Sequence, residues 1–244
     1  MKADFFGQKG VTLIELMVAM AIAGVIGAAM IAFQQSQTRS YVTNEVLVDM
    51  QQNARAAMHF MVSEIKMAGC DPLGRANAGI RTATDDSITF TMDFAGDDTF
   101  TITNFDGSSR DYELSRADGN IDMAGEEITY ALDGINLMRT DHQPDPDDPR
   151  VQELSRNLDA LNFVYYNADG DRIDNPANRL NDIRSVLITI VARSGESIPG
   201  FMYRHTDTQT YRNQEGEVIL PAQNDHFRRI MLSTEVRLRN AGLS

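Results

Sequence analysis

Hydrophobic residues near the start of the chain form one long, almost uninterrupted run. From Val11 to Phe33 there are 23 residues, and the only formal charge among them is Glu15. At about 1.5 Å per helical residue, a helix of that length can cross a hydrocarbon core about 30 Å thick. A lone carboxylate in such a run costs roughly 2.5–3.5 kcal/mol near the helix centre and less near the interface. The pattern therefore predicts a membrane-spanning helix whose carboxylate has a function.

Basic residues flank this run on one side only. Lys2 and Lys9 precede it, and no further Lys or Arg occurs until Arg39. Because basic flanks are retained on the cytoplasmic side of a membrane, the asymmetry predicts a cytoplasmic N-terminus. The rest of the chain is then expected on the outer side.

Apolar residues further along recur at helical spacing. Steps of three or four residues place them on one helix face. The members of this stripe are Val46, Met50, Ala54, Ala57, Met61, Ile65 and Ala68. Gly69 and Pro72 then supply a helix stop signal. The pattern predicts one helix from about residue 12 to residue 68, about 85 Å long by the rise per residue.

After residue 71 the period changes to two, as expected for β-strands. Ile88, Phe90, Met92 and Phe94 alternate with polar residues, which predicts a half-buried strand. Further strand candidates are Phe100–Ile102, Tyr112–Leu114, Glu127–Leu132, Ile135–Arg139, Leu158–Tyr166, Ile183–Ala192 and Ile230–Leu238.

Turn and loop signals separate these candidates. Asp106-Gly107 and Asp133-Gly134 are two-residue turn signals. Residues 141–149, with three prolines and four aspartates, are predicted to be a linker or surface loop. Residues 195–227 are polar and weakly patterned, which indicates some structure of their own or mobility. The whole pattern predicts an α+β fold, with the helix stripe packed on a mainly antiparallel β-sheet.

Composition narrows the classes of function. The chain has 244 residues and a formal net charge of −13. Removing residues 1–10 takes away two lysines and one aspartate, a net +1, and leaves −14. An acidic body argues against broad binding to a nucleic-acid backbone, which requires a basic surface. Cys70 is the only cysteine, so no intrachain disulfide can form, and a small apolar core thiol is expected.

Catalytic motifs are absent, and we predict that the chain is not an enzyme and needs no cofactor. The sequence lacks the phosphate-binding, dinucleotide, zinc-protease and serine-hydrolase motifs. One possible metal site remains, because Asn167, Asp169 and Asp171 place oxygen-bearing side chains at alternate positions, as calcium prefers. The spacing of glycine and the lack of a terminal glutamate do not fit an EF-hand. The alternative is a turn after a strand, which Asn-x-Asp-Gly sequences form readily.

The first residues carry a resemblance to a known family. A short basic leader that ends in glycine precedes an apolar helix with glutamate at its fifth position, and this resembles type IV pilins and type II secretion pseudopilins. The resemblance implies that a prepilin peptidase cuts after Gly10 and that the new N-terminal residue, Val11, is methylated on its amine. Val11 stands where the family usually has phenylalanine. Glu15 is the fifth-position carboxylate, which the family's assembly model pairs with a neighbouring subunit's N-terminal amine.

A second, weaker resemblance concerns the end of the helix and the later strands. The segment from Asn53 to Gly69, the strand end at Tyr165-Tyr166 and the terminal Arg237–Asn240 are similar to PilW-type minor pilins and J-type pseudopilins. The chain is longer than most major pilins, and Ala32 stands where many of them have proline. These points imply a minor pilin of the priming or tip complex, with other minor pilins, the major pilin, the prepilin peptidase and the inner membrane as partners.

The resemblance also implies a division of the chain. We expect residues 1–10 to be the leader, 11–38 the membrane and filament-core half of the helix, 39–70 its amphipathic half, and 71–244 the β-rich head. Two alternatives remain at this point. One is a J-like pseudopilin of a type II secretion system. The other is a secreted soluble binding protein or hydrolase with an ordinary signal peptide, which the charge of Glu15 and the helical pattern beyond residue 30 disfavour.

Overall fold

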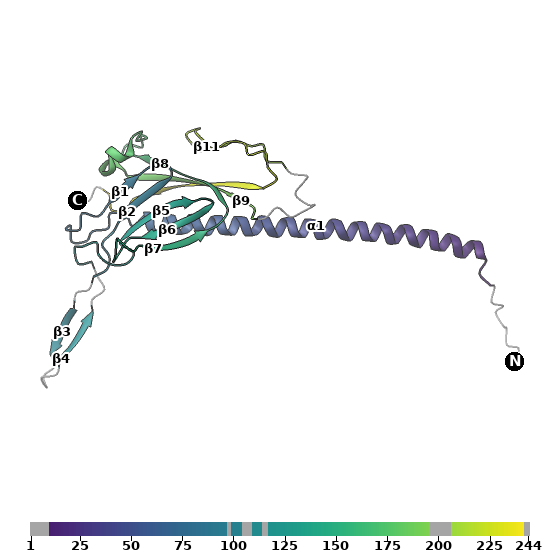
Figure 1. Ribbon diagram of the computed structural model, residues 1–244, viewed down its shortest axis with the longest axis horizontal. Coiled ribbons are helices and arrows are strands. Elements are labelled where there is room, and N and C mark those ends of the chain that lie inside the picture. The colour runs from purple at the N-terminus through teal and green to yellow at the C-terminus, as the bar shows by residue number, and fades with distance from the viewer. Residues whose placement is uncertain (1–9, 97–98, 104–108, 114–116, 196–205, 242–244) are drawn as a thin grey trace, which may run out of the picture. The chain divides into compact units, whose positions relative to one another are not determined.

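The chain divides into two compact units, Met1–Val46 and Leu47–Ser244. The computed structural model describes residues 10–96, 99–103, 109–113, 117–195 and 206–241. Helix α1 (Leu13–Ile65) supplies the structure of the first unit and the first element of the second (Figure 1). Its bounds confirm the predicted helix, which begins one residue later and ends about three residues earlier than expected.

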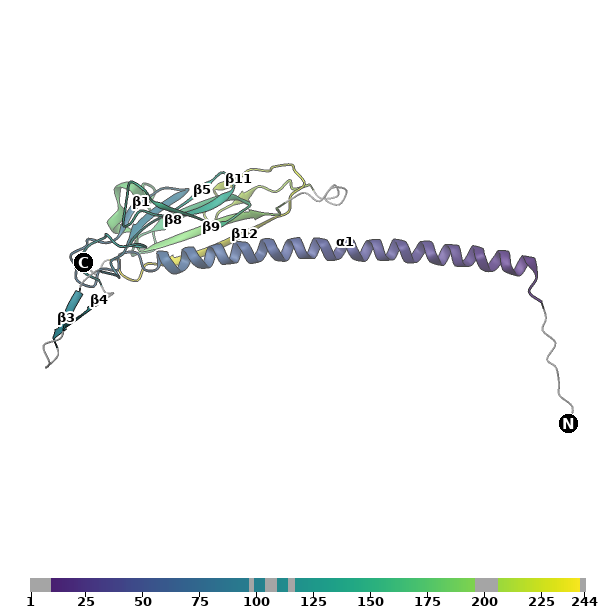
Figure 2. The same cartoon turned by 60° about the horizontal axis from the view of Figure 1, so that its bottom comes forward.

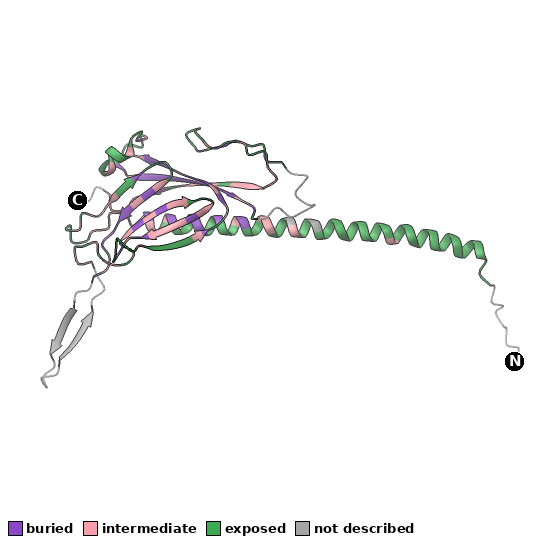
Figure 3. Cartoon of the chain, viewed as in Figure 1, coloured by how far each residue is buried: buried purple, intermediate pink, exposed green. Residues whose placement is uncertain are grey.

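In the first unit the helix is apolar on all sides and exposed. Side chains from Val11 to Phe33 lie at the surface, as the green first part of α1 shows in Figure 3. The large apolar side chains among them, such as Ile14, Val25 and Phe33, are each more than half exposed. By length and composition this helix can cross a membrane. A helix that is apolar on every face needs a surrounding of lipid or of other helices.

In the second unit the same helix buries one stripe. Six members of the predicted stripe are buried, and Met58 joins them; they are Met50, Ala54, Ala57, Met61, Ile65 and Ala68. Ala54 and Ala57 are fully buried, and their small side chains allow the helix backbone to lie close to the strands. Val46 is the exception, because it belongs to the first unit and is half-buried. The predicted stripe therefore packs into the core of the second unit from Met50 onwards.

Gly69 ends the helical region as predicted. Its φ of 76° lies in the left-handed region, which a residue with a Cβ adopts only with strain. Its N–H donates to the carbonyl of Thr91 at 2.9 Å. Through this hydrogen bond, Gly69 also connects the end of the helical region to the last residue of strand β2 (Ser87–Thr91).

The larger sheet has five antiparallel strands in the order β1-β2-β5-β6-β7. Its strands are β1 (Ile80–Ala83), β2 (Ser87–Thr91), β5 (Glu127–Asp133), β6 (Asn136–Asp141) and β7 (Arg150–Ser155). Ile88, Phe90 and Tyr130 point into the core that contains the helix stripe, and all three are fully buried. The hydroxyl of Tyr130 and Nε of Arg139 both donate to Glu64 on α1, Arg139 at 3.0 Å. The helix is thus attached to this sheet by polar and apolar contacts.

A second sheet has three antiparallel strands in the order β12-β9-β8, seen side by side in Figure 2. They are β8 (Leu158–Tyr166), β9 (Ser185–Arg193) and β12 (Arg229–Arg237). Every residue of β9 from Ser185 to Ala192 is buried. A strand buried on both faces needs cover on both sides. One side faces the core shared with the helix, which includes Ile188 and Ile190.

Smaller elements complete the second unit. Strands β3 (Thr99–Thr103) and β4 (Ser109–Glu113) pair with each other, and so do β10 (Tyr211–Arg212) and β11 (Val218–Leu220). Two short 3-10 turns, η1 (Pro176–Asn178) and η2 (Leu180–Asp182), lie between β8 and β9. The predicted turn at Asp106-Gly107 and Leu114 lie outside the described residues.

The predicted α+β class is confirmed, but the single predicted sheet is wrong. The chain leaves the first sheet after β7 at Asn157, whose φ of 61° turns it into β8 of the second sheet. The bounds of β8 match the prediction, whereas β1 and β7 were not predicted. Residues Arg150–Glu153 of β7 are all exposed, so they carry no alternation of apolar and polar positions. Phe94, predicted to be buried, is 44% exposed because the strand ends at Thr91.

Two loop predictions are corrected in detail. Asp133 pairs with Asn136, so the β5–β6 turn is centred on Gly134 and the next residue, one place later than predicted. Gly134 has a φ of 61°, as a type II′ hairpin requires at its first central position. In the predicted loop 141–149, Asp141 is buried at the end of β6. Its carboxylate accepts the backbone N–H groups of Gly125 and Gln143 at 3.0 and 3.2 Å.

Candidate functional site

The predicted cleavage point lies just outside the start of α1. Gly10 and Val11 are exposed and have no helical structure, and the helix begins at Leu13. Thr12 is the residue at which the chain enters the helix, because its carbonyl accepts the N–H of Leu16 at 3.2 Å. The peptide bond between Gly10 and Val11 is therefore not part of the helical hydrogen-bond ladder.

Thr12 and Glu15 form a capping box. The hydroxyl Oγ1 of Thr12 accepts the backbone N–H of Glu15 at 3.3 Å. In return, Oε2 of Glu15 accepts the backbone N–H and the hydroxyl of Thr12 at 3.0 and 2.8 Å. Such reciprocal bonds satisfy two donors that the first turn of a helix leaves unpaired.

Sequence analysis considered Glu15 only as a charge and missed this cap. The signal was present, because Thr12-x-x-Glu15 before an apolar run is the sequence signature of a capping box. Glu15 Oε2 is occupied by Thr12, while no bond is recorded for Oε1 among the described residues. Glu15 can therefore cap its own helix and keep one oxygen for another partner.

The three residues of the predicted calcium site lie together in the turn after β8. The side-chain oxygen of Asn167 accepts the backbone N–H groups of Asp169 and Asp171 at 2.9 and 2.8 Å. Gly170 has a φ of 85°, which suits this tight turn. These hydrogen bonds within the segment account for the turn, as expected if the residues form a turn after a strand. Within the described ranges no group of three or more His, Cys, Asp or Glu side chains is arranged to hold a metal ion, and calcium binding stays a prediction.

Cys70 lines a cavity of about 590 Å³ at the end of the second unit where the helix stops. The cavity is formed by the segment after Gly69, by η2 and by the residues that follow β12. Burial, with smaller contributions from the carboxylates of Asp93 and Asp71, raises the pKa of the Cys70 thiol. The thiol is therefore protonated and weakly nucleophilic near neutral pH. The expected core thiol is only half-buried.

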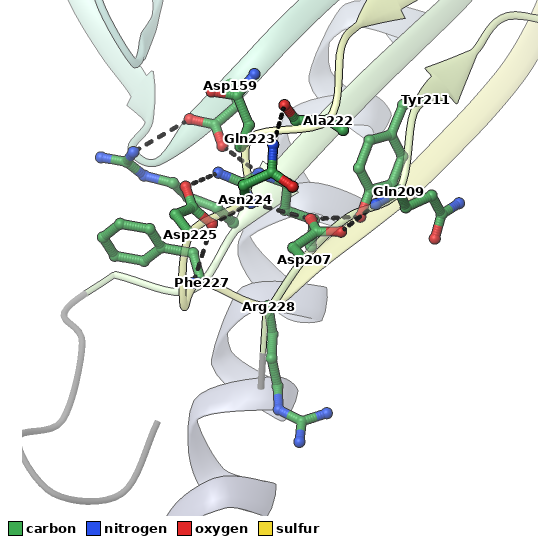
Figure 4. A network of polar contacts seen from close by, with 12 residues as sticks. Asp159, Asp207, Gln209, Tyr211, Ala222, Gln223, Asn224, Asp225, Phe227 and Arg228 are labelled. Atoms are coloured by element: carbon green, nitrogen blue, oxygen red, sulfur yellow. Dashed lines mark hydrogen bonds and ion pairs between the residues drawn. The ribbon is translucent and has the colours of Figure 1, made fainter. Parts of the chain in front are cut away.

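A buried arginine joins three aspartates at one end of the second sheet. The side chain of Arg229, at the start of β12, is 1% exposed. It binds Asp159 at 2.6 Å, Asp207 at 2.9 Å and Asp225 at 2.6 Å, and Figure 4 shows these three carboxylates converging. Hydrogen bonds from Arg229 hold the pKa of Asp225 below its ordinary value. For Asp207, burial acts in the opposite direction, but hydrogen bonds from Gln209, Arg229 and Tyr211 outweigh it and lower the pKa.

This cluster anchors a segment that we call the strap, residues 206–228, which contains β10 and β11. Tyr211 and Leu220 of the strap form a small apolar cluster with Ala160 of β8 and Val191 of β9. The strap thus supplies cover for the other face of β9. Further along it, Glu215 accepts a hydrogen bond from Tyr166, and Glu217 pairs with Arg172 at 2.7 Å. Sequence analysis predicted none of these contacts.

The comparisons with known proteins bear first on the N-terminal segment. Residues 6–31 match the family described as the prokaryotic N-terminal methylation motif. This stretch contains the non-helical Gly10–Val11 bond, the capping box and most of the exposed apolar helix. Together with the α+β second unit, these features support a type IV pilin-like protein, a class whose members are structural proteins and not enzymes.

A relative in sequence is named as a pilin-like protein. The chain is 24% identical over 200 residues to the pilin-like protein PilA3 of Thermus thermophilus, covering 78% of this chain and 82% of the relative. Among solved structures, a type IV-like pilin from Thermus thermophilus shares 11% identity with a TM-score of 0.46, over 78% of this chain and 97% of that chain. The methylation motif and the PilA3 relative support the predicted type IV pilin-like family.

Proposed function

We propose that this chain is a minor pilin of a type IV pilus. A prepilin peptidase cuts it between Gly10 and Val11, and the mature subunit joins the priming or tip complex that initiates pilus assembly. One observation carries the proposal: the match to the methylation motif coincides with a non-helical, exposed Gly10–Val11 bond directly before a capped apolar helix.

The apolar part of α1 serves as the membrane anchor before assembly. Its exposure on all faces and its length support this role. Lys2 and Lys9 would hold the N-terminus in the cytoplasm, so that the second unit folds on the outer side of the inner membrane. During assembly the same surface would leave lipid and pack against the anchors of other minor pilins and of the major pilin.

A charge pair between Glu15 and an N-terminal amine would guide this packing. Cleavage creates a free amine at Val11, and methylation keeps its positive charge. A cation and a carboxylate in an apolar environment are each costly alone, and pairing offsets much of both penalties. Oε1 of Glu15 is the oxygen that the capping box leaves for the amine of an adjacent subunit.

The alternative is a J-like minor pseudopilin of a type II secretion system, which would be processed in the same way. Purification of the protein with its native partners separates the two, since one complex contains pilins and the other contains secretion pseudopilins. The minor-pilin role is favoured by the resemblance of residues 53–69 to PilW-type subunits.

Mass spectrometry of the exported protein tests the proposal. We expect a mature chain that begins at Val11 and carries one methyl group on its amine. A chain that begins near Met30 would indicate an ordinary signal peptide and a soluble secreted protein, and the pilin role would be wrong.

A further inference from the structure

We propose that the Thr12 hydroxyl is a positioning group for the cleavage reaction: it makes the helix begin after Thr12 and so keeps the Gly10–Val11 bond outside the helix for the peptidase. The inference rests on the proposed processing of this chain. It assigns to Thr12 a role that the charge of Glu15 cannot fill.

The argument starts from the hydrogen bonds that a longer helix would need. In an α-helix each N–H donates to the carbonyl four residues earlier. If α1 grew towards the N-terminus, the N–H of Glu15 would bind the carbonyl of Val11. The next bond would join the N–H of Ile14 to the carbonyl of Gly10, which is the carbonyl that the peptidase must attack.

The capping box takes the donor of the first of these bonds, without which the helix does not extend to the second. The N–H of Glu15 donates instead to Oγ1 of Thr12 at 3.3 Å, so it is not available to Val11. The N–H of Thr12 is held by Glu15 Oε2 at 3.0 Å, which fixes the turn into the helix at that residue. Among the described residues, no backbone hydrogen bond to the carbonyl of Gly10 or Val11 is recorded.

A free carbonyl and an extended backbone are what hydrolysis requires. Water adds to the carbonyl carbon of Gly10, and the bond from that carbon to the nitrogen of Val11 breaks. The hydroxyl remains on the new carboxyl group of Gly10, and a proton goes to the new amine of Val11. A carbonyl already engaged in a helix would have to leave its hydrogen bond first, in an apolar interface where unpaired backbone groups are costly.

Two substitutions separate the cap from the charge. Thr12→Val keeps the size and branching of the side chain but removes the hydroxyl, and it leaves Glu15 charged. Glu15→Gln removes the charge, yet its amide oxygen can still accept the N–H of Thr12, since Gln also serves in capping boxes. Thr12→Ser keeps the hydroxyl and is the matched control.

The experiment measures the rate at which a prepilin peptidase cuts the full-length precursor in phospholipid vesicles. We expect Thr12→Val to be cut roughly fivefold more slowly, the change in population that corresponds to losing an N-cap worth about 1 kcal/mol. Thr12→Ser and Glu15→Gln should be cut within about twofold of the native rate. In the same variants, the rate of amide hydrogen exchange at Glu15 is compared with the native rate. A changed rate shows that the N–H of Glu15 has changed its hydrogen-bond partner.

Several outcomes would overturn the inference. Native cleavage of Thr12→Val would show that the hydroxyl does not matter, and equally slow cleavage of Glu15→Gln would assign the effect to charge. Slow cleavage of Thr12→Ser would assign it to the shape of the side chain. If the native precursor is cut elsewhere than between Gly10 and Val11, the proposed function itself fails, and this result is distinct from the other three.

Discussion

At the scale of single residues, the second unit contains charged groups that are buried and fully paired. Arg229 is the clearest case, because one guanidinium binds three carboxylates from β8 and from both ends of the strap. Arg156 differs, since its side chain is 75% exposed and it pairs with Glu153, three residues away. Buried pairs are strongly destabilising when one partner is removed, whereas exposed pairs contribute little.

Replacement of Arg229 by alanine should therefore be severe. It leaves the nearly buried carboxylate of Asp207 without its cation and Asp159 with Arg193 alone, at 3.3 Å, and we expect a loss of about 3–5 kcal/mol in the free energy of unfolding. Thermal melting of the full chain in detergent, followed by circular dichroism, gives the comparison. Arg156→Ala is the matched control and should cost less than about 1 kcal/mol. Equal melting temperatures for the two variants would contradict the cluster's structural role.

At the scale of elements, α1 has two faces in the second unit. Met61 is fully buried, whereas its neighbour Phe60 is 52% exposed. We expect Met61→Asp to unfold the second unit, because an unpaired charge in an apolar interface is strongly penalised. Phe60→Asp adds the same charge one position away and should leave the unit folded. A cooperative melt of Met61→Asp at the native temperature would show that this stripe does not form the core.

The strap should be the first element of the second unit to loosen in acid. The pKa values of Asp225 and Asp207 are lowered in the folded chain, as is that of Glu217, which binds Arg172. A depressed folded pKa means that the stabilisation is present above the unfolded value, about 3.9 for Asp and 4.3 for Glu, and is lost as the pH falls through the folded value.

Amide hydrogen exchange checks this expectation. Protection factors in the strap should fall as the pH is lowered below about 4, before those of β5 do. The residues of β5 are a suitable internal reference because none of them contacts the strap in the recorded hydrogen bonds and ion pairs. Simultaneous loss of protection in both segments would indicate global unfolding instead.

The sequence predicts an element well when the residues that determine it are close together in the chain. The helix stripe and β8 were predictable because each buries a face whose period is visible in the residues. The end of the helix was predictable from Gly69. Strand β7 was not, because Arg150–Glu153 are all exposed and show no alternation of apolar and polar positions. The switch to a second sheet depends on one residue, Asn157.

The residues of the candidate site also differ in whether the sequence could predict them. Gly10, Val11 and Glu15 were predicted from a resemblance, and the capping box could have been predicted from four consecutive residues. The Arg229 cluster could not, since Asp159 lies 70 residues away in the sequence and only strand pairing brings it near. The same holds for Glu64 of α1 and its partner Arg139 in β6, 75 residues apart.

At the scale of the whole molecule, the two units have opposite relations to solvent. The first exposes apolar side chains from Val11 to Phe33, while the second encloses a core to which α1 contributes from Met50 onwards. The predicted boundary after residue 38 would leave that contribution intact.

Removal of residues 1–38 should therefore yield a soluble, monomeric and folded protein. The whole buried stripe remains, and the exposed apolar run that requires lipid is gone. Size-exclusion chromatography with light scattering and a thermal melt measure the two properties. Aggregation of the truncated chain, or a melt without cooperativity, would show that the first half of the helix is needed for folding.

The connection between β2 and β5 has its own consequence. Its two ends are tied to each other: Glu126 accepts the N–H groups of Phe94 and Ala95, and Asp93 accepts those of Asp118 and Gly119. Asp93 and Glu126 are both fully buried, so these hydrogen bonds belong to the core of the second unit. They hold the two ends of the connection together whatever sequence lies between them. Closing a longer loop costs little, about 0.6 kcal/mol for each doubling of length. The segment between these ends can therefore be lengthened, shortened or replaced in evolution. A new binding surface can arise there while the residues of the core stay the same.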